Sequence, residues 1–201
     1  MSIIDQSDQF SSIDISSIKP AVDKLARSSP IIQRQVVQHG YPPAWRRKPG
    51  YSSLVYTILE QQVSLASARA VYERLLVAII DLTPDNFLQF DDNELRSFGF
   101  SRQKALYCRI LARLILAGEL DIDALPGKSD EEIGAELIAV KGIGRWTADI
   151  YLLHSLGRPD IWPTGDLALR IAVQEEMGIE ERLTQDETAV LGRPFSPLRS
   201  V

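Results

Sequence analysis

The chain of 201 residues contains one cysteine, Cys108, and two histidines, His39 and His154. A single cysteine cannot form an internal disulfide, and it cannot supply the four thiolates of an iron–sulfur cluster. The histidines are isolated from one another, and no cluster of His, Cys and acidic residues has the spacing of a metal site. We therefore expect a protein without a cofactor and without a catalytic metal.

The sequence also lacks an apolar run long enough to span a bilayer and an N-terminus with the features of a signal peptide. We expect a soluble, cytoplasmic protein with no membrane partner. Its formal net charge of -5 argues against binding of nucleic acid by overall charge, since nucleic-acid-binding domains are commonly basic. The acidic residues are concentrated in 121–136 and 175–187, however, and local basic groups lie at 46–48 and 102–104. Weak non-specific binding to DNA is compatible with this distribution.

No stretch alternates apolar and polar residues over a convincing strand length, whereas helical periodicity recurs along the chain. Leu54 and Ile58 lie four residues apart, as do Val55 and Leu59, and Val71, Leu75 and Ile79 continue the pattern. An all-α fold is predicted. Residues 1–17, rich in Ser, Asp and Gln, are predicted to form a flexible arm. Residues 18–201 are long enough for one compact domain or two small lobes that share a cleft.

Two pairs of residues predict helix ends. Ser29 followed by Pro30 is typical of a helix start, and Gly40 of its end. Ser129, with Glu132 three residues later, has the pattern of a capping box and predicts the start of another helix.

A glycine-containing turn, Val140-Lys141-Gly142-Ile143-Gly144, lies between two segments of helical period, which predicts a helix–hairpin–helix. Glycines two positions apart allow positive φ angles and leave no side chain between the turn and a ligand. The amides of residues 142–145 are expected to point outward at the start of the second helix, where unpaired N–H groups and the helix dipole suit a phosphate. A DNA backbone is an obvious ligand.

Downstream, Asp166 follows the turn Pro163-Thr164-Gly165 and precedes an apolar run. This position is typical of a helix N-cap, whose side-chain oxygen accepts a hydrogen bond from a backbone N–H. A carboxylate at the same position can also take part in catalysis. The two roles are compatible.

The hairpin segment 142–148 (GIGRWTA) and the segment 163–170 (PTGDLALR) together resemble the helix-hairpin-helix superfamily of DNA glycosylases. The similarity is closest to the 3-methyladenine DNA glycosylase II type, which removes alkylated bases. It implies a two-lobed helical bundle with the active site in the cleft between the lobes, a monomer, and double-stranded DNA with alkylated bases as the partner. It also implies base flipping, hydrolysis of the N-glycosidic bond and an abasic product. The catalytic aspartate of the family corresponds to Asp166.

The resemblance also implies DNA contacts. Residues 58–64 match the loop that enters the minor groove, where an inserted side chain fills the gap left by an extruded nucleotide. Gln62 is the residue expected to insert. The hairpin carbonyls, including those of Val140 and Ile143, are expected to hold a monovalent cation that bridges to phosphate. The full expected DNA-binding set is Gln61, Gln62, Ser64, Lys141, Gly142, Ile143, Gly144, Arg145 and Thr147.

Base selection is expected from aromatic stacking, because an aromatic face attracts a cationic base more than a neutral one. Trp146 is the first candidate by resemblance, and Tyr151 and Trp45 are further candidates for the base pocket. Superfamily members that also cut the strand carry a lysine at the position of Trp146 and form a Schiff base. Tryptophan cannot do this, so a monofunctional glycosylase is expected.

Other interpretations stay open from the sequence. A non-catalytic helix-hairpin-helix module would keep Gly142 and Gly144 but would not need Asp166 at a fixed distance. A glycosylase for oxidised or mismatched bases is a second alternative, against which the missing lysine and cysteines count. Lys104 and its neighbour Arg102 fit either phosphate contacts or solvated surface charges.

The C-terminus departs from the family pattern. The family usually continues past a Trp/Arg-Pro-x-Arg-Ser motif into a long final helix, whereas this chain ends with residues 192–201 (GRPFSPLRSV). The C-terminal helix of the domain is therefore expected to be truncated.

Overall fold

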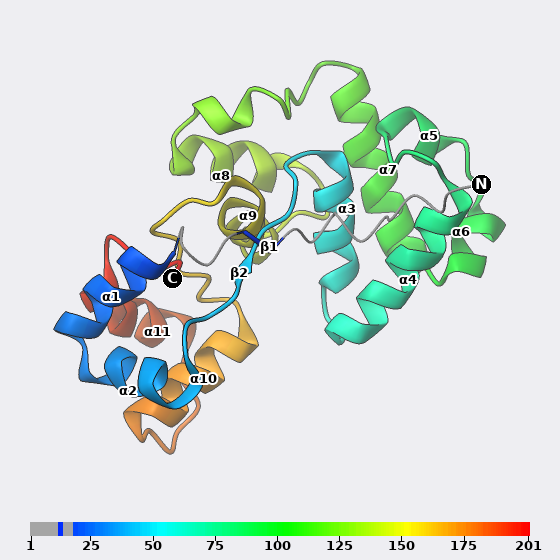
Figure 1. Cartoon of the computed structure of the whole chain (residues 1–201). Coiled ribbons are helices and arrows are strands. Elements are labelled where there is room, and N and C mark those ends of the chain that lie inside the picture. Colours follow the sequence, from blue (N-terminus) through cyan, green and yellow to red (C-terminus); the bar gives the residue numbers. More distant parts are fainter. Residues whose placement is uncertain (1–11, 14–17) are drawn as a thin grey trace, which may run out of the picture. The chain divides into compact units, whose positions relative to one another are not determined.

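The computed structural model of the chain describes residues 12–13 and 18–201 (Figure 1). The predicted flexible arm, residues 1–17, lies outside the described residues apart from Ser12 and Ile13. The described part is built from helices. Its strand pairing consists of two residues on each side, β1 (Ser12–Ile13) antiparallel to β2 (Ala44–Trp45). The prediction of an all-α fold is confirmed.

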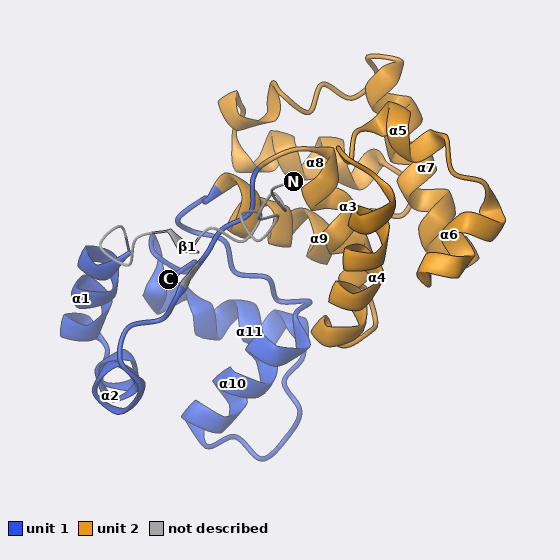
Figure 2. Ribbon diagram, turned by 45° about the vertical axis from the view of Figure 1, so that its right-hand side comes forward, with its two compact units in different colours: residues 1–48, 157–201 blue, residues 49–156 orange. Residues whose placement is uncertain are grey.

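The chain divides into two compact units (Figure 2). Unit 1 combines residues 1–48 with residues 157–201, and unit 2 is the continuous segment 49–156. The helices of unit 1 are α1 (Lys19–Ser28), α2 (Pro30–His39), α10 (Leu167–Met177), α11 (Gln185–Gly192) and the short 3₁₀ turn η5 (Arg193–Phe195). The helices of unit 2 are α3 (Tyr51–Glu60), α4 (Leu65–Ala78), α5 (Pro84–Leu88), α6 (Asp92–Phe98), α7 (Arg102–Leu116), the 3₁₀ turn η3 (Leu125–Gly127), α8 (Asp130–Ala139), α9 (Arg145–Ile150) and the π-helical turn η4 (Tyr151–Leu156), which continues α9.

Helix α3 forms the core of unit 2. It packs against α4, α7 and α9. Both predicted apolar stripes are buried, since Leu54, Val55 and Ile58 are 0% exposed and Leu59 is 2% exposed. A helix that is apolar on opposite sides has neighbours on both, so α3 lies inside the unit rather than on its surface.

The stripe predicted on α4 is only partly correct. Leu75 is fully buried, but Val71 and Ile79 are half-buried, and Tyr72 takes the neighbouring core position. The helix ends at Ala78, and Ile79 has an extended backbone, so it no longer shares the helical face.

The predicted helix ends agree with the structure. The side chain of Ser29 accepts a hydrogen bond from within α2, Pro30 is the first helical residue, and Gly40 ends the helix with φ 79°. Ser129 and Glu132 form a reciprocal capping box at the start of α8. These caps use only local sequence, which is why the pattern alone could predict them.

Within unit 1, α1 packs on α2 and α10 packs on α11. Polar contacts link the two pairs, because Arg34 and Gln35 of α2 donate to the carboxylate of Glu176 on α10, at 3.1 and 2.6 Å. Helix α10 begins directly after Asp166, so the packing of unit 1 positions the predicted catalytic residue. None of the described helices is long and apolar enough to cross a bilayer.

Candidate functional site

The glycine turn of unit 2 joins α8 to α9 as predicted. Gly142 has φ 98°, a value that disfavours other residues. A Cβ atom at Gly142 would lie 2.1 Å from Cγ of Tyr107, so the ring of Tyr107 occupies the space where a side chain would start. Gly142 is therefore required by the protein itself.

Gly144 has a different environment. It is the N-cap of α9 with φ -97° and ψ 178°, a conformation open to any residue. A Cβ atom there would meet nothing within 4 Å, and the residue is exposed. Of the two hairpin glycines, only Gly142 uses the positive φ that glycine allows. Neither backbone strain nor internal packing requires glycine at this position.

The polar groups of the hairpin fall into inward and outward sets. The backbone N–H of Ile143 donates to the carbonyl of Val140 at 3.0 Å, so this amide is used within the turn. The side chains of Ile143 and Thr147 are buried, at 4% and 2% exposed. Of the expected DNA-binding residues, Ile143 and Thr147 therefore direct their side chains into the core, which leaves only backbone groups for a contact with DNA.

Lys141 and Arg145 remain at the hairpin surface. Lys141 is exposed, and the side chain of Arg145 is 76% exposed although its Nε donates to Oδ1 of buried Asp149 at 2.8 Å. Burial raises the pKa of the Asp149 carboxyl above its usual value, and Arg145 partly opposes this effect. The ion pair orients the arginine on the outer face of α9.

Gln61 lies at the C-terminal end of α3, directly beside the hairpin. Its Nε2 donates to the carbonyl of Gly142 and to Oγ1 of Thr147, both at 2.9 Å. The side-chain amide therefore connects the end of α3 to the middle of the turn and to the first turn of α9. Gln61, one of the expected DNA-binding residues, thus uses both of its side-chain N–H groups inside the protein.

The next residue, Gln62, has a different environment. It is exposed, and its φ of 57° places a non-glycine residue in the left-handed region. Such conformations are sparsely populated and often mark functional sites. Ser64, also exposed, accepts a hydrogen bond from the backbone N–H of Ser67 and caps α4. The loop between α3 and α4 thus presents Gln62 from two capped helices.

The three aromatic candidates for a base pocket have different surroundings. Trp146 is half-buried on α9, and Trp45 is 72% exposed in unit 1. Tyr151 is 0% exposed, and its hydroxyl accepts a hydrogen bond from the backbone N–H of Gly50 at 3.1 Å. Burial raises the pKa of the Tyr151 hydroxyl to about 12. The prediction that Tyr151 lines a base pocket is wrong, since its ring is part of the core of unit 2.

Lys104 was open to two interpretations, and the structure favours neither. Its Nζ donates to the carbonyl of Leu59 at 2.7 Å, within the last turn of α3. Partial burial lowers the pKa of Lys104. A cation at a helix C-terminus is favourable, so Lys104 stabilises the end of α3 that carries Gln61 and Gln62.

Asp166 belongs to unit 1 and is the N-cap of α10. Its Oδ1 accepts a hydrogen bond from the backbone N–H of Leu169 at 2.9 Å, and its own N–H donates to the carbonyl of Pro163 at 2.8 Å. The N-cap prediction is confirmed. The residue is half-buried, and the hydrogen bond from Leu169 orients its carboxylate.

Some residues that the sequence did not single out support the hairpin and the turn before Asp166. Tyr107 supports the hairpin through Gly142, and no local pattern distinguishes it from other helical aromatics. Asp160 and Arg199 form a bidentate ion pair beside the turn that leads to Asp166. Arg199 and Ser200 match the last two residues of the family motif, but the sequence does not indicate Asp160 as their partner. Within the described ranges, no group of three His, Cys, Asp or Glu residues could hold a metal ion.

The HhH-GPD superfamily of base excision DNA repair proteins matches residues 55–195, and the chain belongs to this superfamily. It is 29% identical to the YfjP protein of Bacillus subtilis (strain 168) over 158 residues, which cover 75% of this chain and 55% of YfjP. The chain thus spans about half the length of that relative.

Two solved structures are similar over most of their length. The Schizosaccharomyces pombe 3-methyladenine DNA glycosylase Mag1, in complex with abasic DNA, has a TM-score of 0.82 and 25% identity. The match covers 90% of this chain and 91% of that one. A DNA-3-methyladenine glycosidase from Bacillus halodurans has a TM-score of 0.75 and 29% identity, covering 90% of this chain and 85% of that one.

Proposed function

We propose that this protein is a monofunctional DNA glycosylase that flips alkylated bases such as 3-methyladenine out of duplex DNA and hydrolyses the N-glycosidic bond. The observation that carries the proposal is Asp166, a half-buried carboxylate fixed at the start of α10 by the N–H of Leu169. Similarity to two proteins named 3-methyladenine glycosylases, one bound to abasic DNA, supports it.

Asp166 supplies the charge that the reaction needs. Departure of the base develops positive charge on the deoxyribose, as in glycoside hydrolysis. A carboxylate close to the anomeric carbon stabilises this charge and orients or deprotonates the attacking water. An alkylated purine such as 3-methyladenine already carries positive charge and leaves readily, so no second acid is required.

The hairpin binds the DNA backbone. Open space at Gly144 lets a phosphate approach the start of α9, where the helix dipole favours an anion. Lys141 and Arg145 add positive charge at this surface. We expect a monovalent cation on the carbonyls of Val140 and Ile143 to bridge to the same phosphate.

Gln62 is the residue proposed to enter the minor groove. Its exposed position in the left-handed region projects it from the loop between α3 and α4. An amide at this position can fill the gap left by the flipped base and hydrogen-bond to the base that remains. Trp146 is proposed to stack on the damaged base, because a cation–π contact favours a charged purine by about 0.5–2 kcal/mol. With tryptophan there, a Schiff base cannot form, and the product is an abasic site.

The test is release of methylated bases from duplex DNA by the wild type and the Asp166→Asn variant. Asparagine is as good an N-cap as aspartate, so α10 is preserved while the negative charge is removed. We expect the release rate to fall by about 10²–10⁴-fold. Strand cuts should appear only after alkali treatment, as an abasic product requires.

Asp91→Asn is the matched control. Asp91 is also an aspartate N-cap, at α6, and accepts hydrogen bonds from the N–H groups of Asn93 and Glu94. This variant should release bases at the wild-type rate. Equal rates for the two asparagine variants would exclude Asp166 as the catalytic residue, and DNA binding by a folded wild type without release would leave only a binding module.

A further inference from the structure

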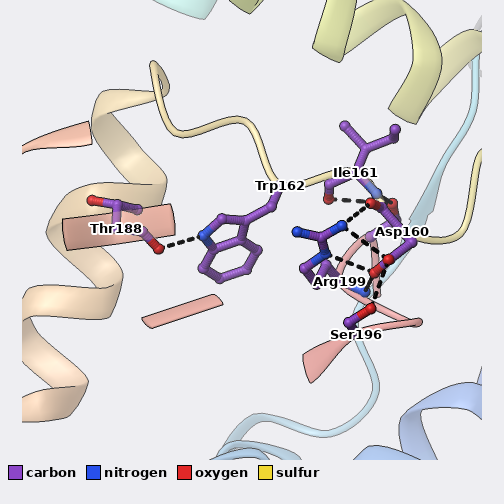
Figure 3. Close-up of polar contacts among 7 residues, drawn as sticks. Asp160, Ile161, Trp162, Thr188, Ser196 and Arg199 are labelled. Carbon is purple, nitrogen blue, oxygen red and sulfur yellow. Dashed lines mark hydrogen bonds and ion pairs between the residues drawn. The ribbon is translucent and has the colours of Figure 1, made fainter. Parts of the chain in front are cut away.

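The C-terminal tail of the chain, residues 196–201, is bound to the segment 159–161, and Figure 3 shows its contacts with Asp160 and Ile161. Arg199 forms a bidentate pair with Asp160, with Nε 2.7 Å from Oδ1 and Nη2 2.9 Å from Oδ2. Its Nη2 also donates to the carbonyl of Asp160 at 3.0 Å. Ser196 donates to the same carboxylate at 2.8 Å. The carboxylate and the backbone of one residue are therefore both held by the tail.

The next residue of the segment is held as well. The N–H of Ile161 donates to Oγ of Ser200 at 2.8 Å, and the N–H of Ser200 donates to the carbonyl of Pro159 at 3.1 Å. These bonds bracket Asp160 on both sides along the chain. The tail is thus attached to unit 1 by several hydrogen bonds.

Trp162 is fixed from a different direction, by α11. Its Nε1 donates to the carbonyl of Thr188 at 2.8 Å, and Figure 3 shows the indole directed toward that residue. A Cβ atom at Gly192 would lie 2.4 Å from the same nitrogen, so the indole packs directly on the end of α11. The segment 160–162 is therefore held by the tail on one side and by α11 on the other.

This anchored segment leads directly into the turn that ends at Asp166. Pro163, Thr164 and Gly165 are the intervening residues, and Pro163 is buried. A chain extends at most about 3.3–3.6 Å per residue, so the four steps from Trp162 to Asp166 keep the two residues within about 13–14 Å of each other. The N–H of Asp166 also donates to the carbonyl of Pro163 at 2.8 Å, which closes the turn. The anchored segment 160–162 is therefore joined to the start of α10 by a short turn with its own hydrogen bond.

We infer that Arg199, through Asp160, is a positioning residue that holds the Pro163–Asp166 turn so that the Asp166 carboxylate is correctly placed for base excision. The inference rests on the function proposed above. A guanidinium suits this role because its rigid fork sets both the distance and the orientation of a carboxylate. In accordance with this contact, Arg199 holds the pKa of the Asp160 carboxyl below its usual value.

The test compares Arg199→Met and Arg199→Lys with the control Arg193→Met. Arg193 lies in the same C-terminal region and is exposed, so its replacement removes the same charge without touching Asp160. Three quantities are measured for each protein. They are the single-turnover rate of 3-methyladenine release at saturating enzyme, the affinity for a duplex with a tetrahydrofuran abasic analogue, and hydrogen exchange of the amides of Ile161 and Leu169.

We expect Arg199→Met to lower the release rate by about 10–100-fold, since small misplacements of a reacting group have effects of this size. Its duplex affinity should stay within about two-fold of the control, because an interaction that acts on the chemical step lowers the rate and not the binding. The release rate of Arg199→Lys should lie between the rates of Arg199→Met and the wild type, because lysine keeps the charge but not the planar fork of the guanidinium. The two amides should exchange faster in Arg199→Met than in Arg193→Met.

Equal release rates for Arg199→Met and Arg193→Met would overturn the inference, and so would a rate and an affinity that fall together in proportion to the folded fraction. Unchanged amide exchange would overturn it independently of activity. A wild type that binds the duplex but releases no base would instead refute the proposed function, and the controls separate this result from the others.

Discussion

The two glycines of the hairpin are expected to respond in opposite ways to the same substitution. Gly142→Ala places a methyl group 2.1 Å from the ring of Tyr107 and keeps a residue with a Cβ at φ 98°. A left-handed conformation costs about 1–2 kcal/mol, and overpacking costs about 1–3 kcal/mol. Together they predict a loss of about 2–5 kcal/mol in the free energy of unfolding. For a chain of this size, that lowers the melting temperature by roughly 5–20 °C.

Gly144→Ala should not destabilise the protein. Its methyl group meets nothing within 4 Å, and φ is -97°. Replacing glycine by alanine at a compatible position restricts the unfolded chain and stabilises by about 0.4–1 kcal/mol. If Gly144 admits a phosphate, the added methyl group should instead weaken binding to all duplexes alike, whether damaged or not.

Urea unfolding followed by circular dichroism, together with fluorescence anisotropy on damaged and undamaged duplexes, measures both effects. The effect of Gly142→Ala in a Tyr107→Ala background separates the two costs at Gly142, because this background removes the steric overlap and leaves the backbone strain. A Gly142→Ala protein as stable as wild type, or a Gly144→Ala protein destabilised to the same degree, would refute the reasoning.

Three further outcomes are expected. Gln61→Ala removes two internal hydrogen bonds, each with a net contribution of about 0.5–1.5 kcal/mol. Urea unfolding should therefore show that the free energy of unfolding falls by roughly 1–3 kcal/mol. An unchanged free energy of unfolding would mean that these bonds contribute nothing to stability. Trp146→Ala should reduce the preference for methylated over normal bases more than the affinity for DNA, as competition assays can measure, and equal losses would show a purely structural role. Asp160→Asn should lower stability at pH 7 by about 1–3 kcal/mol, the range for hydrogen bonds to charged groups. Because the folded-state pKa of Asp160 is lowered, the stabilisation is present above the unfolded value of 3.8 and is lost as the pH falls below it, so the difference from wild type should shrink in acid. A difference that stays constant from pH 7 to acid would contradict the assignment of that pKa shift.

Helix positions were predictable where their signals are local. The capping box of Ser129 and Glu132 and the N-cap at Asp166 use side chains that bond within three residues of their own position. Such patterns work in almost any tertiary context. The end of α4 was harder to place, because no glycine or proline marks it and the apolar spacing of four residues continues through Ile79 in the sequence.

The predicted site residues differ in whether their side chains face the protein interior or the solvent. Gln61 and Gln62 are adjacent and chemically identical, yet one bonds to the hairpin and the other is exposed in the left-handed region. Ile143 and Thr147 lie in the correct motif but face the core. A linear motif places residues along the chain and cannot say which side of a turn faces a partner.

By itself, the sequence determined the helical class, the hairpin and the aspartate N-cap, because periodicity, paired glycines and capping residues act over a few positions. It also excluded an iron–sulfur cluster through its single cysteine. Only the tertiary structure decided that Tyr107 occupies the space beside Gly142, that Tyr151 is buried, and that Arg199 holds Asp160. Each of these contacts joins residues far apart in the chain, and their pairing depends on how whole helices pack, which no local pattern specifies.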